Sequence, residues 1–235
     1  MQTSTGQPTT ADPKADPKAT LDACSGGTFG TVSRAGLVER PDQAFPKLSA
    51  LLGYLDTLRA RADLAVLTEL LNGLDVSRCD IAGCCQFGGK GYRRNTIARS
   101  DWYELLALCW RSGDCTPIHD HQGVSCAFRV VEGQGTEIRF VPTASGLIKP
   151  VASIEMNPGY VCAADDADIH QVCNMQAPGQ DLVTLHIYSP PIRTMHTYAF
   201  TNAISPDAAS SYEKPQEPAR EYAAPKGGNG PDMHC

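Results

Sequence analysis

The sequence lacks the marks of a membrane, secreted or nucleic-acid-binding chain. No apolar run approaches the ~20 residues that a membrane-spanning helix needs. Met1–Thr20 is polar and proline-rich, without the basic segment and apolar core of a secretory signal. The net charge is −6 and no long basic run is present, which argues against nucleic acid as a partner. We therefore expect a cytoplasmic monomer that contacts neither membrane nor nucleic acid.

The ten cysteines also lack an obvious structural pattern. They do not form two CxxC pairs at the spacing of a zinc ribbon. A cytoplasmic compartment keeps thiols reduced, so we do not predict a disulfide framework. Outside the central motif described below, we expect small core residues or free surface thiols. These cysteines are Cys24, Cys79, Cys84, Cys85, Cys109, Cys115, Cys162, Cys173 and Cys235.

The 235 residues are enough for one domain with appendages, and a hydrophobic content of 42% can supply its core. Residues 1–25 contain Ala-Asp-Pro-Lys twice and have few apolar side chains, which predicts a disordered tail. We assign residues 26–95 to a helical segment that packs on a barrel formed by residues 96–203. Residues 204–235, rich in proline, alanine, glycine and charge, form a second predicted tail.

Leucines recur at three- and four-residue spacing across residues 41–75, which predicts helices that bury one face. Pro46 suits a first helical turn and Gly73 suits a helix end. We interpret the leucine stripes as core rather than functional. They comprise Leu48, Leu51, Leu52, Leu55 and Leu58, then Leu64, Leu67, Leu70, Leu71 and Leu74.

From Trp102 onward, short apolar runs alternate with turn signals, which is typical of a β-sandwich or small barrel. Such a barrel can be filled by side chains or can hold one small ligand. The fold class predicted is therefore mainly β with N-terminal helices. The expected strands are Tyr103–Trp110, Cys126–Val131, Thr136–Val141, Val151–Met156, Tyr160–Ala163, Leu182–Tyr188 and Thr197–Phe200.

The most informative stretch holds two histidines two residues apart. In a β-strand, residues i and i+2 point to the same face about 7 Å apart, so His119 and His121 would converge. Asp120 would point away as a structural residue. Neutral imidazoles on one face suit a transition metal, and His170 is a third candidate ligand. The alternative is a set of structural histidines, and we interpret His196 as a structural or surface residue.

The spacing around these histidines resembles the first cupin motif. Its order is Gly113, His119-x-His121, Cys126 and Gly133, with cysteine where most cupins have glutamate. His170-x-x-x-Asn174 is similar to the end of the second cupin motif. Together with the cysteine substitution, two further runs resemble the cysteine dioxygenase family over roughly residues 45–200. These runs are Tyr92-Arg93-Arg94-Asn95 and Leu185-His186-Ile187-Tyr188-Ser189-Pro190-Pro191.

This resemblance implies a cupin fold around a mononuclear non-haem Fe(II) held by three histidines, here His119, His121 and His170. It implies oxidation of L-cysteine by O2 to cysteine sulfinic acid, a reaction of cysteine catabolism and of taurine and sulfinate metabolism. Three neutral ligands leave the iron more cationic than the common two-histidine, one-carboxylate site. That charge suits a substrate that binds as a thiolate, because a metal deprotonates a coordinating thiol.

The resemblance also implies roles for residues around the metal. Arg94 would bind the substrate carboxylate, for which its planar fork offers two parallel charge-assisted hydrogen bonds. Tyr92 would line the same pocket. Tyr188 would lie near the iron, joined to Cys126 by a thioether.

A hydrogen-bonded relay to Tyr188 is implied as well, through Thr184 and His186. The family usually has serine at the first of these positions. The three residues alternate, so they share one face of a strand. Polar groups on an interior face need partners, and a relay supplies them. The family also has a cis peptide bond at the position of Ser189-Pro190.

Three alternatives stay open. A related enzyme could oxidise 3-mercaptopropionate or another small thiol acid, although Arg94 favours cysteine because that similar group tends to have glutamine there. A zinc-dependent cupin hydrolase or isomerase also uses three histidines and a water. A non-enzymatic cupin could sense or store metal, but it would need neither the relay strand nor Arg94.

Overall fold

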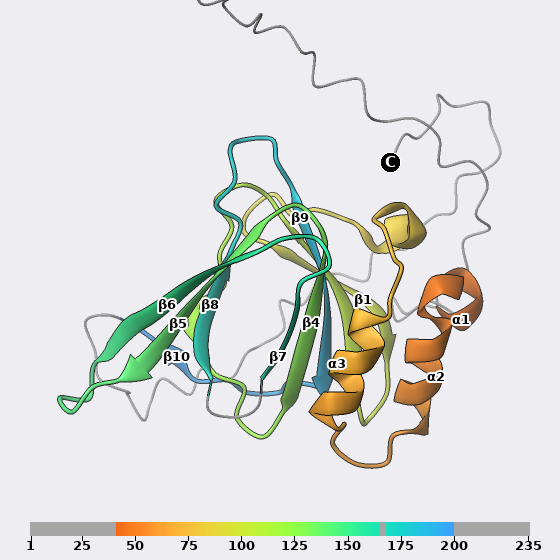
Figure 1. Cartoon of the computed structure of the whole chain (residues 1–235), viewed down its shortest axis with the longest axis horizontal. Helices are drawn as coiled ribbons and strands as arrows, with labels where there is room; N and C mark the ends of the chain where they lie inside the picture. The colour runs from red at the N-terminus through yellow and green to blue at the C-terminus, as the bar shows by residue number, and fades with distance from the viewer. Residues whose placement is uncertain (1–40, 165–167, 200–235) are drawn as a thin grey trace, which may run out of the picture.

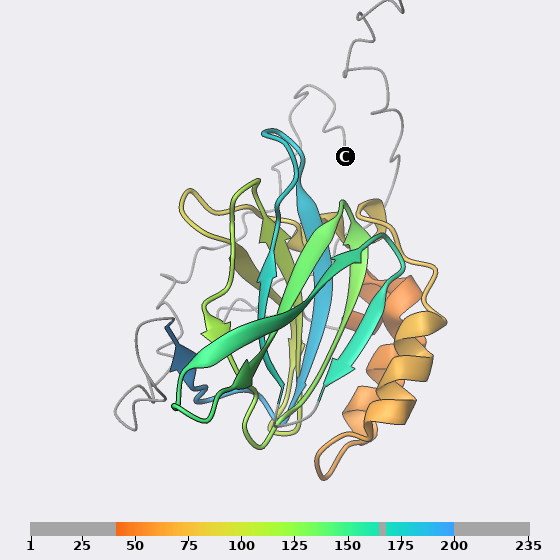
Figure 2. The same ribbon diagram turned by 60° about the vertical axis from the view of Figure 1, so that its left-hand side comes forward.

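The computed structural model describes residues 41–164 and 168–199, so both predicted tails, 1–25 and 204–235, lie outside the described residues. Within those ranges, ten strands form two antiparallel five-stranded sheets that face each other (Figures 1 and 2). The first sheet has the order β1 (Arg93–Arg99), β2 (Glu104–Trp110), β9 (Leu182–Ser189), β4 (Ser125–Glu132), β7 (Val161–Ala164). The second has the order β10 (Thr197–Tyr198), β3 (Ile118–His119), β8 (Ile169–Cys173), β5 (Gly135–Pro142), β6 (Ile148–Met156).

The N-terminal helices cover the outer face of the first sheet (Figure 1). The predicted helical stretch is interrupted: the backbone of Leu58 is extended, and the next helix starts after Asp63, whose carboxylate accepts from the N–H groups of Ala65 and Val66. That helix ends at Gly73, as expected. The elements are α1 (Pro41–Ala44), the 3-10 turn η1 (Pro46–Leu48), α2 (Ser49–Thr57), α3 (Leu64–Asn72) and the 3-10 turn η2 (Cys79–Cys84).

Strand β9 divides the core in two because its side chains alternate between faces. Val183, Leu185 and Ile187 pack beneath the helices with the leucines of α2 and α3. Leu182 and Tyr188 face the space between the sheets, where Trp110 and Phe128 are also buried. All eight residues of β9 are buried, so the strand lies inside the protein on both faces.

The predicted mainly β fold with N-terminal helices is confirmed. Each predicted strand corresponds to a strand of the structure, as far as its residues are described. The sequence did not predict β1 or β8 as strands. The predicted boundary between residues 95 and 96 falls inside β1. Strand β3 is short, because only Ile118 and His119 belong to it.

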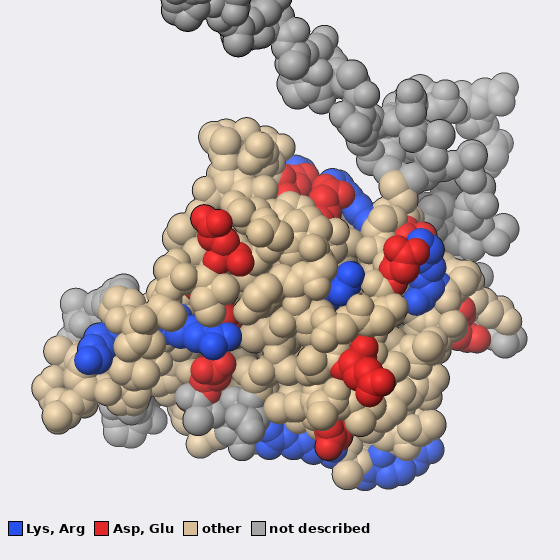
Figure 3. Space-filling model, in the orientation of Figure 1, with Lys and Arg blue, Asp and Glu red and all other residues tan. Residues whose placement is uncertain are grey.

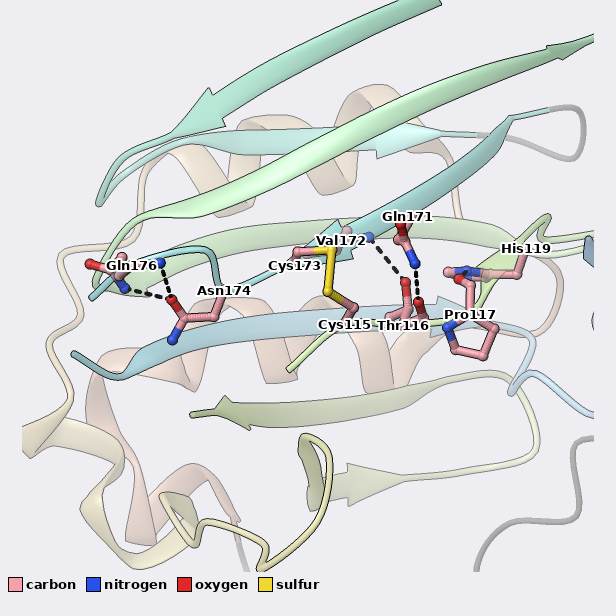
Figure 4. Close-up of a disulfide and its surroundings, with 9 residues drawn as sticks. All are labelled: Cys115, Thr116, Pro117, His119, Gln171, Val172, Cys173, Asn174 and Gln176. Carbon is pink, nitrogen blue, oxygen red and sulfur yellow. Dashed lines mark hydrogen bonds between the residues drawn. A yellow bond between two sulfur atoms is a disulfide. The ribbon is translucent and has the colours of Figure 1, made fainter. Parts of the chain in front are cut away.

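The expectation that Cys115 and Cys173 are separate thiols was wrong. Figure 4 shows the disulfide between them, which joins the segment before β3 to the last residue of β8. The two residues face each other across an isolated antiparallel bridge, with their Cα atoms 4.1 Å apart, so their side chains meet. Cys79 also takes part in a disulfide. The free cysteines among the described residues are Cys84, Cys85, Cys109, Cys126 and Cys162.

The surface carries mixed charge. On the face shown in Figure 3, lysine and arginine side chains are interspersed with aspartate and glutamate. None of the described helices is both long and apolar enough to span a bilayer.

Candidate metal centre

The structure brings the three predicted ligands together between the sheets. His119 on β3 is the direct cross-strand partner of His170 on β8, and His121 follows two residues after His119. Their ring centroids are 4.8–4.9 Å apart, and the candidate ligand atoms all lie within 4.8 Å of one another. All three side chains are buried. The predicted i, i+2 convergence therefore occurs, although His121 lies beyond the end of the strand.

Hydrogen bonds orient two of the rings. The Nδ1 of His119 lies 2.9 Å from the carbonyl oxygen of Pro117, as Figure 4 shows, and the Nδ1 of His170 lies 2.8 Å from Oε1 of Glu137. Both partners are acceptors, so each Nδ1 carries the proton and each Nε2 keeps a lone pair for a ligand bond. The Nδ1 of His121 is buried without a hydrogen-bond partner among the described residues.

The surroundings keep His119 and His121 neutral. Burial lowers the pKa of His119 to about 3, with a further contribution from His170. Burial likewise lowers the pKa of His121 well below its ordinary value, helped by His119 and His170. Neutral imidazoles with free lone pairs are the form that binds a metal. The donor set therefore fits one transition-metal ion.

A pocket opens from these histidines to the other predicted site residues. It brings together every residue that the sequence analysis placed near the metal except Thr184. Its lining consists of Tyr92, Arg94, Leu108, Thr116, His119, His121, Cys126, His170, Val172, His186, Tyr188 and Met195. The Tyr92 ring stacks on Trp110 with centroids 4.3 Å apart, which fixes one wall.

Arg94 reaches this pocket from β1 and is held there by a glutamate that the sequence analysis missed. Its Nη2 lies 3.3 Å from Oε2 of Glu104, a buried residue on β2. The other oxygen of Glu104 lies 3.4 Å from Nη1 of Arg99. The guanidinium carbon of Arg94 also lies over the Tyr188 ring, 5.2 Å from its centroid. Arg94 thus presents a positioned cation to the pocket.

The residues predicted as a relay are in hydrogen-bond order along β9. Thr184 Oγ1 lies 2.9 Å from Nε2 of His186, and the Tyr188 hydroxyl lies 3.5 Å from Nδ1 of His186. Trp110, which the sequence analysis did not include, donates from Nε1 to Thr184 Oγ1 at 3.0 Å. Thr184 can therefore donate its own proton to His186, and its methyl group is accommodated in a fully buried position.

Cys126 and Tyr188 face each other directly on β4 and β9. Burial raises the pKa of the Cys126 thiol well above its ordinary value. Burial and the neighbouring Cys126 likewise raise the pKa of the Tyr188 hydroxyl. Both groups therefore keep their protons at neutral pH. Direct cross-strand neighbours are the closest side chains that two strands offer.

Asp120 turns away from the three histidines, as expected, and is buried. Its carboxylate accepts hydrogen bonds from the Tyr198 hydroxyl at 2.7 Å and from His196 Nδ1 at 3.0 Å. His196 is therefore a structural partner, which agrees with its interpretation from the sequence. These bonds tie the ligand segment to the residues around β10.

The family match and the similar sequences point to one family. The family described as "Cysteine dioxygenase type I" matches residues 46–201. Cysteine dioxygenase type 1 of Bos taurus is 26% identical over 168 residues, which cover 68% of this chain and 84% of the bovine protein. The Homo sapiens protein is 27% identical over 111 residues, which cover 46% of this chain and 55% of the human protein.

Solved structures similar to the chain include an uncharacterized Klebsiella pneumoniae protein with a double-stranded beta-helix domain. It has a TM-score of 0.42 and 9% identity, covering 50% of this chain and 88% of that one. An RmlC-like cupin from Desulfovibrio desulfuricans has a TM-score of 0.35 and 22% identity, covering 46% and 90%. The predicted cupin fold is confirmed by the family match and the two facing antiparallel sheets. Since the matched region exceeds half of the sequence, the chain belongs to the cysteine dioxygenase type I family.

Proposed function

We propose that the protein is a thiol dioxygenase that converts L-cysteine and O2 to cysteine sulfinic acid at a mononuclear Fe(II) site. One observation carries the proposal: His119, His121 and His170 converge in a buried pocket that also holds Arg94 and Tyr188. The family match supports a dioxygenase, and the relatives named above are cysteine dioxygenases. The pocket combines a metal-binding donor set with an anchor for a small anion.

His119, His121 and His170 would hold the iron through nitrogen atoms that carry no charge. Bound Fe(II) would supply the site at which the substrate thiolate and O2 react, with both oxygen atoms passing to sulfur. The protein's contribution is to hold the substrate in a single orientation there, which makes the step effectively intramolecular. The buried walls of the pocket exclude water, which strengthens the electrostatic contacts within it.

Arg94 would bind the substrate carboxylate. Its side chain is 10% exposed, so an anion that reaches it is desolvated and the charge-assisted hydrogen bonds gain strength. Nη2 of Arg94 donates to Glu104, which holds the guanidinium at the pocket, and a planar guanidinium offers five N–H donors in all. Tyr92, stacked on Trp110, would limit the length of substrate that fits between Arg94 and the metal.

Tyr188 would control protons beside the substrate. Its hydroxyl stays protonated and is connected to Thr184 through His186, so it can donate a hydrogen bond into the pocket. A thioether between Cys126 and Tyr188 would fix the ring; its formation would remove one hydrogen from the thiol and one from the ring, with O2 as the oxidant. Intact mass before and after turnover tests this bond: an unchanged mass with an alkylatable Cys126 would count against it.

The function is tested by loading the metal-free protein with Fe(II) without oxygen, then adding L-cysteine and measuring O2 uptake. We expect a product heavier than cysteine by two oxygen atoms. The same assay with 3-mercaptopropionate tests the substrate, because equal or better catalytic efficiency would reassign it. Metal analysis tests the class of enzyme: stoichiometric zinc without O2 uptake would indicate a hydrolase or isomerase, and bound metal without any turnover a binding protein.

A further inference from the structure

Glu137 is a fully buried carboxylate next to the metal centre, on β5 beside β8. Cross-strand pairing places His170 opposite Arg139, so Glu137, two residues from Arg139 on the same face of β5, is a diagonal neighbour of His170. Its Oε1 lies 2.8 Å from the Nδ1 of His170, a normal length for a charge-assisted hydrogen bond. Regular strand pairing therefore fixes this contact.

The second oxygen of Glu137 has its own partner. Nε and Nη2 of Arg139 each lie 3.0 Å from Oε2, and the Cys162 thiol lies 3.8 Å from Oε1. Two donors of the Arg139 guanidinium on one oxygen form a charge-assisted pair with this carboxylate. The carboxylate is thus held ionised in the interior, where an unpaired charge would be costly.

The three histidines differ in what supports them. The Nδ1 of His119 bonds to a neutral carbonyl and that of His121 has no hydrogen-bond partner among the described residues. Of the three, His170 has the anionic partner. Three imidazoles give a metal no negative charge, so a carboxylate one ring away changes the charge balance of the whole site. A hydrogen-bonded carboxylate also fixes the ring plane and makes the opposite nitrogen a better donor.

We propose that Glu137 is a positioning residue of the metal centre: it holds the ring of His170 and supplies, through that ring, the negative charge that the three-histidine set lacks. Arg139 keeps the carboxylate in place from the outer side. The role rests on the metal site of the proposed function, but it does not depend on which thiol is oxidised. No residue spacing in the sequence pointed to it, because Glu137 and His170 are 33 residues apart.

The test compares Glu137→Gln and Glu137→Ala with a matched control, Asp181→Asn. Asp181 is a carboxylate paired with Arg111 at 2.9 and 3.0 Å, and it does not line the pocket. Apparent Fe(II) affinity is measured without oxygen by competition with a chelator, and Co(II) absorption reports the ligand geometry. Thermal unfolding of each metal-free variant checks that it is folded.

We expect the Fe(II) affinity to fall by about 10–100-fold, with alanine at the upper end. Glutamine keeps an acceptor for the His170 N–H but loses the charge, so its loss is smaller and its Co(II) spectrum stays closer to the unmodified protein. Asp181→Asn should bind both ions normally. If folded Glu137→Gln and Glu137→Ala proteins kept the Fe(II) affinity and the Co(II) spectrum of the unmodified protein, the role of Glu137 would be overturned and the metal site would stand. Failure of the unmodified protein to bind either ion would overturn the metal site itself, and this role with it. If the alanine variant does not fold, the Fe(II) affinity and Co(II) spectrum of Glu137→Gln, which preserves the side-chain shape, test the role of Glu137 by themselves.

Discussion

The two sides of the pocket are built in different ways. Strand β9, which carries Thr184, His186 and Tyr188, pairs with β2 and β4 and is buried throughout. Strand β3, which carries His119, has only two residues, with one ladder pair to β8 and two to β10. Long ladders on both edges therefore hold the relay strand, whereas the short β3 depends more on bonds made by side chains.

Those additional bonds surround β3 (Figure 4). The backbone carbonyl of Thr116 accepts a hydrogen bond from Gln171 Nε2 at 2.8 Å. The side-chain hydroxyl of Thr116 accepts one from the Val172 N–H at 3.0 Å. The Cys115–Cys173 disulfide closes the same end. Regular pairing tolerates side-chain changes, but each of these bonds depends on a particular residue. The metal side should therefore be the more sensitive to single substitutions.

The largest effect should come from replacing one histidine on each side of the pocket by alanine. His119→Ala removes a ligand, so we expect stoichiometric Fe(II) binding to be lost, an effect larger than the ~10–100-fold cost of losing a residue behind a ligand. His186→Ala breaks the relay without removing a ligand, so the iron should remain while turnover falls. Metal analysis and O2 uptake on both variants separate binding from catalysis.

His196→Ala is the control for loss of a nearby imidazole, because His196 bonds to Asp120 rather than lining the pocket. It should retain stoichiometric iron, with at most the small loss of affinity that follows from removing one bond to Asp120. Equal iron content in His119→Ala and His186→Ala would contradict the division between the two sides.

The next largest effect concerns the disulfide. It closes a chain segment with a sequence separation of 58, for which the chain-entropy model gives about 4 kcal/mol of stabilisation. We expect the double variant Cys115→Ser, Cys173→Ser to lose up to that free energy of unfolding, measured in denaturant, and to bind iron more weakly. Cys85→Ser, which changes a free thiol, is the control and should lose less than about 1 kcal/mol. A double variant as stable as the oxidised protein would show that backbone pairing is enough on the metal side.

The same division explains what the sequence could predict. Apolar periodicity identified β9, β2 and the leucine stripes of α2 and α3, because those elements are regular and bury one or both faces. It missed β1, whose residues are mostly polar and half-buried, so that its pattern is that of a loop. The candidate metal ligands and the candidate relay were predicted from motifs with local spacing and from the family resemblance that those motifs carry.

Contacts between distant segments that no motif marks could not be predicted. Trp110 meets Thr184 across 74 residues, and Glu137 meets His170 across 33. No neighbouring residue in the sequence marks Glu104 or Glu137 as part of the site. Burial of a charged residue cannot be predicted until its partner is known. The disulfide was missed because the compartment argument assigned every thiol to the reduced state.

A smaller effect, on KM for L-cysteine, should differ between Arg94 and Arg99, which both pair with Glu104. Arg94→Ala should raise KM for L-cysteine by about 10–150-fold, since a charge-assisted hydrogen bond contributes about 1.5–3 kcal/mol. Arg99→Ala also removes a partner of Glu104, but Arg99 is 37% exposed and does not line the pocket. Its KM should change little. Steady-state kinetics on both variants therefore distinguish substrate binding from support of Glu104, and equal KM values would remove Arg94 from the pocket chemistry.

The smallest expected effect concerns two tyrosine–aspartate hydrogen bonds, one on the metal side and one on the relay side. Tyr198 donates to Asp120 at 2.7 Å beside the metal ligands, and Tyr103 donates to Asp56 at 2.6 Å beneath the helices. Replacing either tyrosine by phenylalanine removes one hydrogen bond to a carboxylate and should lower stability by roughly 1–2 kcal/mol. Asp120 lies between His119 and His121, so Tyr198→Phe should also weaken Fe(II) binding about 2–5-fold, the equivalent of up to ~1 kcal/mol. Tyr103→Phe should leave Fe(II) binding unchanged, because β9 and its neighbours hold their side of the pocket without that bond. If both variants lost affinity equally, the metal site would be responding to overall stability rather than to the bonds that fix β3.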